Sequence, residues 1–379
     1  SSPSSMSIAI TEHTFLSFQH SIVVSLPLLD SELYRMLFRR LARPLQTAYS
    51  LATSTRPSLI AYPASHHHQL LRTMATAMSK RLEGKTILVT GASSGIGKST
   101  ALEFARTAPK NLKIILTARR LEALEQLKKD IESEVGNGVK VLPVKLDIAN
   151  PKEVREFVGK LPQEFKDIDV LVNNAGLVKG VAKAPEIEEE DMNVMFATNV
   201  TGLINMTQAI LPIFLARSGS DLPGTGDIIN VGSIAGREPY PGGSIYCATK
   251  AAVRSFTDSL RKELIATRIR VMEIDPGQVE TEFSVVRFYG DKSKADKVYE
   301  GCEPLTPDDI AEVVVFAAGR RENVVLADSL VFPNHQVSFC SSFLFAFHSL
   351  IFAFTRPLLR SCTERTRDEK AYPTLLDSP

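Results

Sequence analysis

Tyr246 and Lys250 lie four residues apart in the segment SIYCATKAAV, and Ser233 precedes the tyrosine by thirteen residues. Residues four apart share a helix face, so the lysine ammonium would lie close to the tyrosine phenol. A free phenol titrates near ~10 and is rarely ionised at neutral pH, whereas a neighbouring cation favours the phenolate. The three residues predict a proton-transfer site in which Ser233 bonds the substrate oxygen. The tyrosine–lysine pattern also arises by chance in a chain with 8 tyrosines, so it needs structural context.

A further polar residue, Asn199, lies in the segment TNVTGLIN, within an otherwise strongly apolar predicted helix. Two roles are open for this side chain. It is either a buried amide whose hydrogen bonds are satisfied inside the protein, or a group that holds a water molecule for proton relay.

Seven short apolar runs alternate with helical patterns along the central part of the chain. The predicted strands are 85–91, 112–120, 140–148, 167–176, 226–236, 269–277 and 324–332, and the clearest helical stretches are 95–107, 121–135, 195–216 and 251–267. This alternation is typical of βαβ units and predicts the α/β fold class, with a parallel sheet covered on both faces. Ligands bind such sheets at the carboxyl ends of the strands, where all the candidate residues fall.

The segment TGASSGIG, residues 90–97, follows the first predicted strand and opens the first predicted helix. Gly91 permits a tight turn, Gly95 lets the backbone approach a pyrophosphate, and Gly97 allows the helix to pack closely on the strand. The free N–H groups and positive end of the helix then face the phosphates. The loop predicts a nucleotide site to which Ser93, Ser94 and Ile96 also contribute, although an ordinary glycine turn is the alternative.

The ends of the next three strands refine this prediction. The second strand ends in Arg119 and Arg120 without an acid, which favours the 2′-phosphate of NADP(H) over the ribose hydroxyls of NAD, unless the arginines are only a solvated corner. After the third strand, Asp147 either accepts a bond from the adenine amino group, beside Ile148, or caps the following helix. After the fourth strand, small residues would let the cofactor pass closely: Asn174, Ala175 and Gly176.

Composition bounds the remaining possibilities. The 379 residues carry a formal net charge of +1, which gives no electrostatic argument for nucleic-acid binding. The four cysteines, Cys247, Cys302, Cys340 and Cys362, form no ligand pattern, which favours a reducing, cytoplasmic location and no metal site.

The two ends of the chain differ from its centre. Residues 1–80 are poor in acids and contain a short histidine run with no acidic or cysteine partners; they predict either a mitochondrial presequence or an extension upstream of a start at Met74 or Met78. Residues 337–379 form a Phe-rich tail that predicts a core helix, an anomalous tail or a membrane contact.

Taken together, TGASSGIG, NNAG, Asn199, Ser233 and the Tyr246–Lys250 pair resemble the short-chain dehydrogenase/reductase superfamily over residues 81–336. The segments LPQEFKDIDVLVNNAG, GSIAGREPYPGGSIYCATK and VETEFSVVRFYG are similar to the NADP-dependent 3-hydroxy acid dehydrogenases of fungi and bacteria. The resemblance implies a single domain with a Rossmann-type, doubly wound parallel sheet of about seven strands, assembled as a dimer or tetramer. It also implies the catalytic set Asn199, Ser233, Tyr246 and Lys250, with Pro276, Gly277, Val279 and Thr281 close to the nicotinamide.

The implied reaction is oxidation of the 3-hydroxyl group of serine, allo-threonine or 3-hydroxypropionate-type acids, and reduction of the matching semialdehydes or ketones. Tyr246 would remove the hydroxyl proton, and Arg237 or Arg287 would bind the substrate carboxylate, unless both are ordinary surface arginines. One alternative is a carbonyl reductase of the same superfamily that acts on uncharged ketones, sugars or lipids. Another is a non-catalytic NADP(H)-binding regulator, against which the intact polar set argues.

Overall fold

The structure of the chain is a computed structural model that describes residues 77–218, 222–300, 303–334 and 336. The Phe-rich tail, the histidine run, and the predicted N-terminal extension up to residue 76 lie outside the described residues. The described part begins with a short helical turn at residues 77–82, in which Leu82 is completely buried.

Seven parallel strands form one sheet, in the order β3-β2-β1-β4-β5-β6-β7. Their bounds are β1 (Thr86–Thr90), β2 (Leu112–Ala118), β3 (Val139–Lys145), β4 (Val170–Asn173), β5 (Thr225–Val231), β6 (Arg268–Pro276) and β7 (Asp328–Val331). All seven predicted strands are present, and the α/β, doubly wound fold is confirmed. The strand order reverses direction between β1 and β4, which is the point where such sheets bind ligands.

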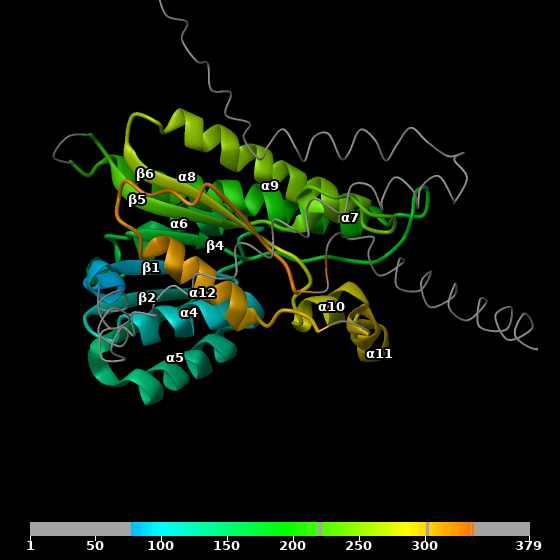
Figure 1. The fold of residues 1–379 in the computed structure, drawn as a ribbon, viewed down its shortest axis with the longest axis horizontal. Coiled ribbons are helices and arrows are strands. Elements are labelled where there is room, and N and C mark those ends of the chain that lie inside the picture. Colours follow the sequence, from blue (N-terminus) through cyan, green and yellow to red (C-terminus); the bar gives the residue numbers. More distant parts are fainter. Residues whose placement is uncertain (1–76, 219–221, 301–302, 335, 337–379) are drawn as a thin grey trace, which may run out of the picture. The chain divides into compact units, whose positions relative to one another are not determined.

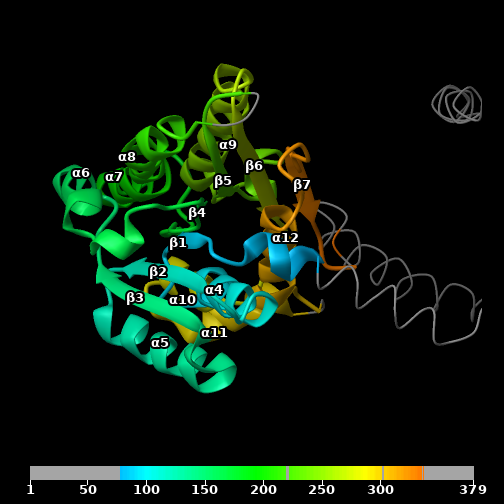
Figure 2. The ribbon, with the colours of Figure 1, turned by 90° about the vertical axis from the view of Figure 1, so that its left-hand side faces the viewer.

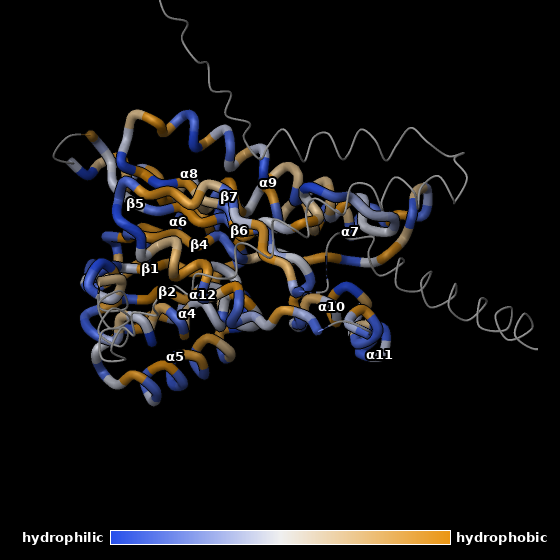
Figure 3. The backbone as a smooth tube through the Cα atoms, in the orientation of Figure 1, coloured by the Kyte–Doolittle hydropathy of each residue, from blue (hydrophilic) through white to orange (hydrophobic). Residues whose placement is uncertain are grey.

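Helices cover both faces of the sheet (Figures 1 and 2). One face carries α4 (Gly95–Thr107), α5 (Leu121–Val135) and α12 (Pro307–Ala318), and the other carries α6 (Pro151–Lys160), α8 (Leu203–Leu215) and α9 (Ser244–Glu263). Phe104 of α4 and Phe214 of α8 are completely buried, one in each hydrophobic layer. Along α5, hydrophobic and hydrophilic segments alternate (Figure 3), as expected of a helix with one face on a core.

Short elements complete the described chain. They are α7 (Glu189–Phe196), α10 (Glu282–Arg287), α11 (Lys292–Asp296), the 3₁₀ turns Gly136–Gly138, Gln163–Phe165, Ile234–Gly236 and Lys297–Tyr299, and a π-helical segment at Ala197–Gly202. The helix predicted at 195–216 begins earlier, at Glu189, because three acids occupy its first turn, where they favour a helix N-terminus. The continuous run Glu189–Leu215 is long and apolar enough to cross a membrane, but Met206 and Ile210 within it are completely buried against the sheet.

Candidate active site

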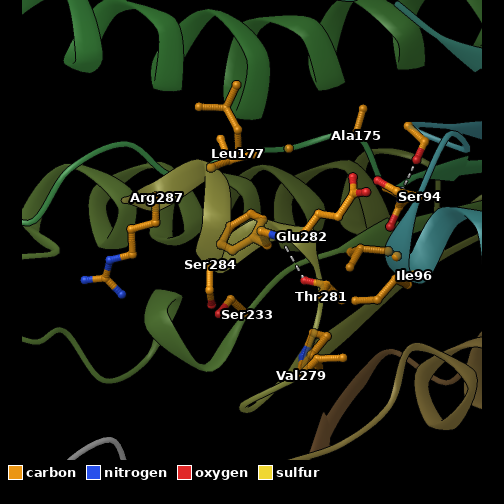
Figure 4. Close-up of a pocket in the computed structure, with 18 of the residues that line it drawn as sticks. Ser94, Ile96, Ala175, Leu177, Ser233, Val279, Thr281, Glu282, Ser284 and Arg287 are labelled. Carbon is orange, nitrogen blue, oxygen red and sulfur yellow. Dashed lines mark hydrogen bonds between the residues drawn. The ribbon is translucent and has the colours of Figure 1, made fainter. Parts of the chain in front are cut away.

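A cavity of about 900 Å³ opens at the carboxyl ends of the strands (Figure 4). Most of the predicted site residues line it: Gly91, Ser93, Ser94, Gly95, Ile96, Arg119, Arg120, Asp147, Ile148, Asn174, Ala175, Gly176, Ser233, Tyr246, Lys250, Pro276, Gly277, Val279, Thr281 and Arg287. Gly97, Asn199 and Arg237 do not line it. The fold therefore gathers residues from six strand ends into one cavity, as the alternating pattern predicted.

The glycine loop is tied to the turn after β4 by close packing. Gly91 has a φ of +68°, the left-handed conformation that favours glycine. A Cβ atom on Gly97 would lie 2.4 Å from Nδ2 of Asn174 and 2.5 Å from the carbonyl oxygen of Gly91. The Asn174 Nδ2 group donates to the Thr90 carbonyl at 2.9 Å, and the Thr90 hydroxyl accepts the Ala175 N–H at 3.0 Å. The backbone of this cradle is therefore fixed before any ligand binds.

The two arginines at the end of β2 fit a phosphate-bearing cofactor. Nη2 of Arg120 donates to the hydroxyls of Ser94 at 3.1 Å and Ser93 at 3.3 Å, and forms an ion pair of 3.0 Å with Glu282. The Arg120 hydrogen bond holds the pKa of the Glu282 carboxyl below its usual range. The Arg120 guanidinium, beside the two serine hydroxyls, thus already binds one anionic group, the Glu282 carboxylate. A 2′-phosphate requires the same kind of cationic site.

Asp147 lines the cavity, but it does not cap the following helix. Asn150 caps α6, because its side chain accepts the backbone N–H groups of Lys152 and Glu153. The Asp147 carboxylate instead accepts the Ala149 N–H at 3.0 Å in a local turn. The capping alternative for Asp147 is wrong, whereas its role toward adenine stays a prediction.

Ser233, Tyr246 and Lys250 all line the cavity. Tyr246 lies in the first turn of α9, and it lines the cavity together with Ser233. Nζ of Lys250 lies 5.9 Å from the centre of the Tyr246 ring and donates to the Val231 carbonyl at 2.8 Å. The helix spacing thus places the lysine beside the tyrosine, as predicted from the sequence.

Burial dominates the titration of both groups. It raises the pKa of the Tyr246 phenol well above its ordinary value, and the hydrogen bond with Ser233 only partly opposes this. Burial also lowers the pKa of Lys250 to about 8, against the opposing charges of Asp275 and Glu273. Among the described residues burial thus dominates the pKa of the Tyr246 phenol, whereas the expectation that Lys250 lowers it beside a bound, oxidised nicotinamide stays a prediction.

Asn199 is a satisfied buried amide. Its Oδ1 atom accepts the Leu177 N–H at 2.8 Å, and its Nδ2 group donates to the Leu177 carbonyl at 2.8 Å and to the Thr249 hydroxyl at 3.1 Å. With both N–H groups and the oxygen engaged, the side chain fastens the segment after β4 to α9. The structure supports this alternative rather than a water held by the amide.

The two arginines predicted to bind a substrate carboxylate, Arg237 and Arg287, lie in different surroundings. Arg237 is ion-paired with buried Asp275 at 2.7 Å and with Asp328, and it lies outside the cavity lining. The predicted role of Arg237 is thus corrected, because its guanidinium neutralises carboxylates of the protein. Arg287 lines the cavity, lies over the Tyr240 ring at 5.3 Å, and has a buried Nε without a hydrogen-bond partner among the described residues.

Sequence reasoning missed several residues around this centre. Glu282 and Phe283 of α10 line the cavity, and the Phe283 ring meets the Tyr246 ring edge-on at 5.6 Å. Asp275 bonds the backbone of Ser233 from the neighbouring strand at 2.9 Å. A signal for the strand residues was present, since two acids at alternate positions interrupt the apolar run IRVMEIDPG. No local pattern marked the α10 residues.

Comparisons with known proteins agree with this geometry. The sequence profile of the family described as short chain dehydrogenase matches residues 85–289. The NADP-dependent 3-hydroxy acid dehydrogenase of Schizosaccharomyces pombe is 59% identical over 256 residues, which are 68% of this chain and 95% of that protein. The serine 3-dehydrogenase of Rhizobium radiobacter is 38% identical over 251 residues, 66% of this chain and 94% of that protein. A solved structure, the closed form of serine dehydrogenase complexed with NADP+, matches with a TM-score of 0.61 and 40% identity, over 67% of this chain and 97% of that one.

Proposed function

Because the chain belongs to the short-chain dehydrogenase family, we propose that it is an NADP(H)-dependent oxidoreductase of small 3-hydroxy acids. It oxidises the 3-hydroxyl group and reduces the corresponding semialdehydes or ketones. The observation that carries this proposal is the presence, in one cavity, of the Ser233–Tyr246–Lys250 set and of Arg287 with an unpaired buried donor. The names of the similar proteins support the same substrate class.

The residues that would hold NADP(H) come from the strand ends of the first half of the sheet. The glycine loop and the N-terminus of α4 face the phosphates, and Arg119 and Arg120 face the 2′-phosphate. Toward the nicotinamide end lie Pro276, Gly277, Val279 and Thr281. When bound, the cofactor supplies the hydride acceptor for oxidation and the hydride donor for reduction.

The protein residues move the proton. In oxidation the Tyr246 phenolate accepts the proton of the substrate 3-hydroxyl, and in reduction the Tyr246 phenol donates that proton to the carbonyl oxygen. Ser233, which lines the cavity with Tyr246, orients the substrate oxygen beside the phenol. The Lys250 ammonium provides a nearby positive charge that favours the phenolate when the proton leaves.

Substitution of Tyr246 by Phe tests the chemical step. Removing the proton donor should lower kcat by about 10²–10⁴-fold, while NADPH binding, followed by fluorescence, stays within a few fold of wild type. Full turnover by this variant would refute the catalytic role of Tyr246 and favour a protein that binds NADP(H) without catalysis.

Substitution of Arg287 by Met tests the substrate class. The Met side chain keeps apolar length but loses the charge, so KM for serine or 3-hydroxypropionate should rise at least about tenfold. The kcat/KM for an uncharged secondary alcohol should not fall, and Arg287→Lys should retain part of the acid activity. An unchanged KM for the acids, with better activity on uncharged ketones, would instead favour the carbonyl reductase alternative.

Assembly and location follow as proposals of the same kind. We propose a homo-oligomer, a dimer or tetramer, because the family resemblance implies one; light scattering on the purified chain measures the mass. We also propose a cytoplasmic location, with a mitochondrial location if residues 1–80 act as a presequence. Fractionation of cells that express the chain with and without residues 1–77 separates the two locations.

A further inference from the structure

Two acidic side chains lie buried on β6, next to the catalytic residues but outside the cavity lining. Glu273 is 2% exposed and Asp275 is 1% exposed, and their alternate positions place them on the same face of the strand. A Cβ atom on Gly232 would lie 1.9 Å from a carboxylate oxygen of Asp275 and 2.6 Å from one of Glu273. The glycine before Ser233 is therefore required by the carboxyl groups that fill the space beside it.

Asp275 holds the turn that carries Ser233. One carboxylate oxygen accepts the Ser233 N–H at 2.9 Å, and the other accepts Nε of Arg237 at 2.8 Å. Ser233 and Arg237 flank the 3₁₀ turn Ile234–Gly236, so a single carboxylate fixes both ends of this turn. Ser233, which lines the cavity with Tyr246, thus takes its backbone position from Asp275.

The same carboxylate acts on the charge of Lys250. Lys250 is 6% exposed, and burial lowers its pKa to about 8; Asp275 makes the largest opposing contribution, ahead of Glu273. The pKa of Glu273 is raised to about 8 by burial and by its neighbour Asp275. The charged groups around Asp275 are Glu273 on β6, Lys250 on α9, Arg237 after the turn, and Asp328 on β7, which shares Arg237.

We propose that Asp275 is a positioning residue of the reaction, which fixes Ser233 through its backbone and places a negative charge near the buried Lys250 ammonium. This inference rests on the function proposed above, because it concerns the same proton-transfer set. Burial alone would favour a neutral lysine, and an ammonium that loses its proton no longer supports the chemistry at Tyr246. Asp275 counteracts that loss from a place that neither substrate nor cofactor occupies.

The experiment is a pH series of kcat/KM in the direction of carbonyl reduction. Burial raises the pKa of the Tyr246 phenol and lowers that of Lys250 to about 8, so we expect activity to be lost above about pH 8 as Lys250 deprotonates. In Asp275→Asn the alkaline limb should move down by about one pH unit or more, because a nearby negative charge is lost. NADPH binding over the same pH range should shift in the same direction, since Lys250 lies in the cofactor cavity.

Further variants separate the two parts of the role. Asp275→Glu keeps the negative charge but moves the carboxylate. The alkaline limb of the pH profile should therefore stay in place, while kcat falls about tenfold because Ser233 is displaced. Asp328→Asn is the matched control: Asp328 is the other acidic partner of Arg237 but does not bond Ser233, so it should leave both limb and kcat near wild type. In Glu273→Gln the alkaline limb of the pH profile should persist, because we assign it to Lys250 and not to Glu273.

Three outcomes would overturn the inference. If Asp275→Asn lowers the melting temperature but keeps the wild-type limb and kcat, Asp275 is only a structural partner of Arg237. If Asp328→Asn reproduces the shift, the effect belongs to Arg237 and not to Asp275. If the limb disappears in Glu273→Gln, it reports Glu273 rather than Lys250. Each of these leaves the proposed function intact, which fails separately if Tyr246→Phe retains turnover.

Discussion

The two sides of the cavity are built in different ways. On the cofactor side, the glycine loop and the turn after β4 are fixed by hydrogen bonds between side chains and backbone and by contacts too close for a Cβ atom. On the substrate side, α10 has only six residues and contributes side chains such as Phe283 and Arg287. The first side leaves little freedom in its backbone, whereas the second depends on which side chains occupy short helices.

This difference suggests different roles for the two sides in cofactor binding and in substrate specificity. A cradle made of backbone N–H groups recognises a phosphate regardless of the substrate, so its residues are set by geometry. A side-chain pocket on short helices changes its preference when a single residue changes. We therefore expect substitutions on the cofactor side to abolish binding and substitutions on the substrate side to alter selectivity.

The largest effect should come from overpacking the cradle. In Gly97→Ala the new methyl group meets Asn174 and the Gly91 carbonyl, so the loop must shift. We expect NADPH affinity to fall by about 100-fold or more, with a loss of about 1–3 kcal/mol in the free energy of unfolding. Fluorescence titration and thermal melts measure the two effects. Gly159→Ala on α6 is the matched control, because its Cβ atom would meet nothing within 4 Å.

The control variant Gly159→Ala should behave differently from Gly97→Ala in both measurements. At Gly159 an alanine should stabilise the helix slightly, by up to about 1 kcal/mol, and leave cofactor affinity unchanged. If Gly97→Ala binds NADPH as tightly as Gly159→Ala does, the glycine loop is not held rigidly by its contacts with Asn174 and Gly91.

A smaller effect is expected at the cationic end of the cofactor side. Removing the guanidinium in Arg120→Ala should weaken NADPH binding by about 10- to 100-fold, because a charged hydrogen bond to phosphate contributes about 1.5–3 kcal/mol. NADH, which lacks the 2′-phosphate, is the internal control and should bind the variant as it binds wild type. An equal loss for both cofactors would mean that Arg120 acts only on the loop through Ser93 and Ser94.

The fold and the cofactor side could be predicted from the sequence because their signals are local. β-branched runs mark the strands, and Gly91, Gly95 and Gly97 mark a turn whose geometry only glycine allows. The Tyr246–Lys250 pair followed from helix periodicity. Each of these signals depends on residues close in the chain.

The substrate side could not be predicted in the same way. Arg237 and Arg287 are equivalent by residue type, and only the fold shows that Asp275 and Asp328 already engage Arg237. The sequence reveals the cation near Tyr246 but not the burial that raises the pKa of its phenol among the described residues. Properties that arise from contacts distant in the sequence are therefore accessible only from the structure.

The smallest predicted effect concerns the ion pair that joins the two sides. Glu282 belongs to α10, yet its carboxylate pairs with Arg120 on the cofactor side, where an incoming 2′-phosphate would compete with it. Glu282→Gln removes this competitor, so NADPH affinity should rise about two- to fivefold, a small change because exposed ion pairs contribute about 0.2–1 kcal/mol. The gain should shrink at high salt and vanish in the Arg120→Ala background, where no guanidinium remains to be released. A gain that persists in the double variant would show that α10 affects the cofactor by another route, and the two sides would then be less separate than their construction indicates.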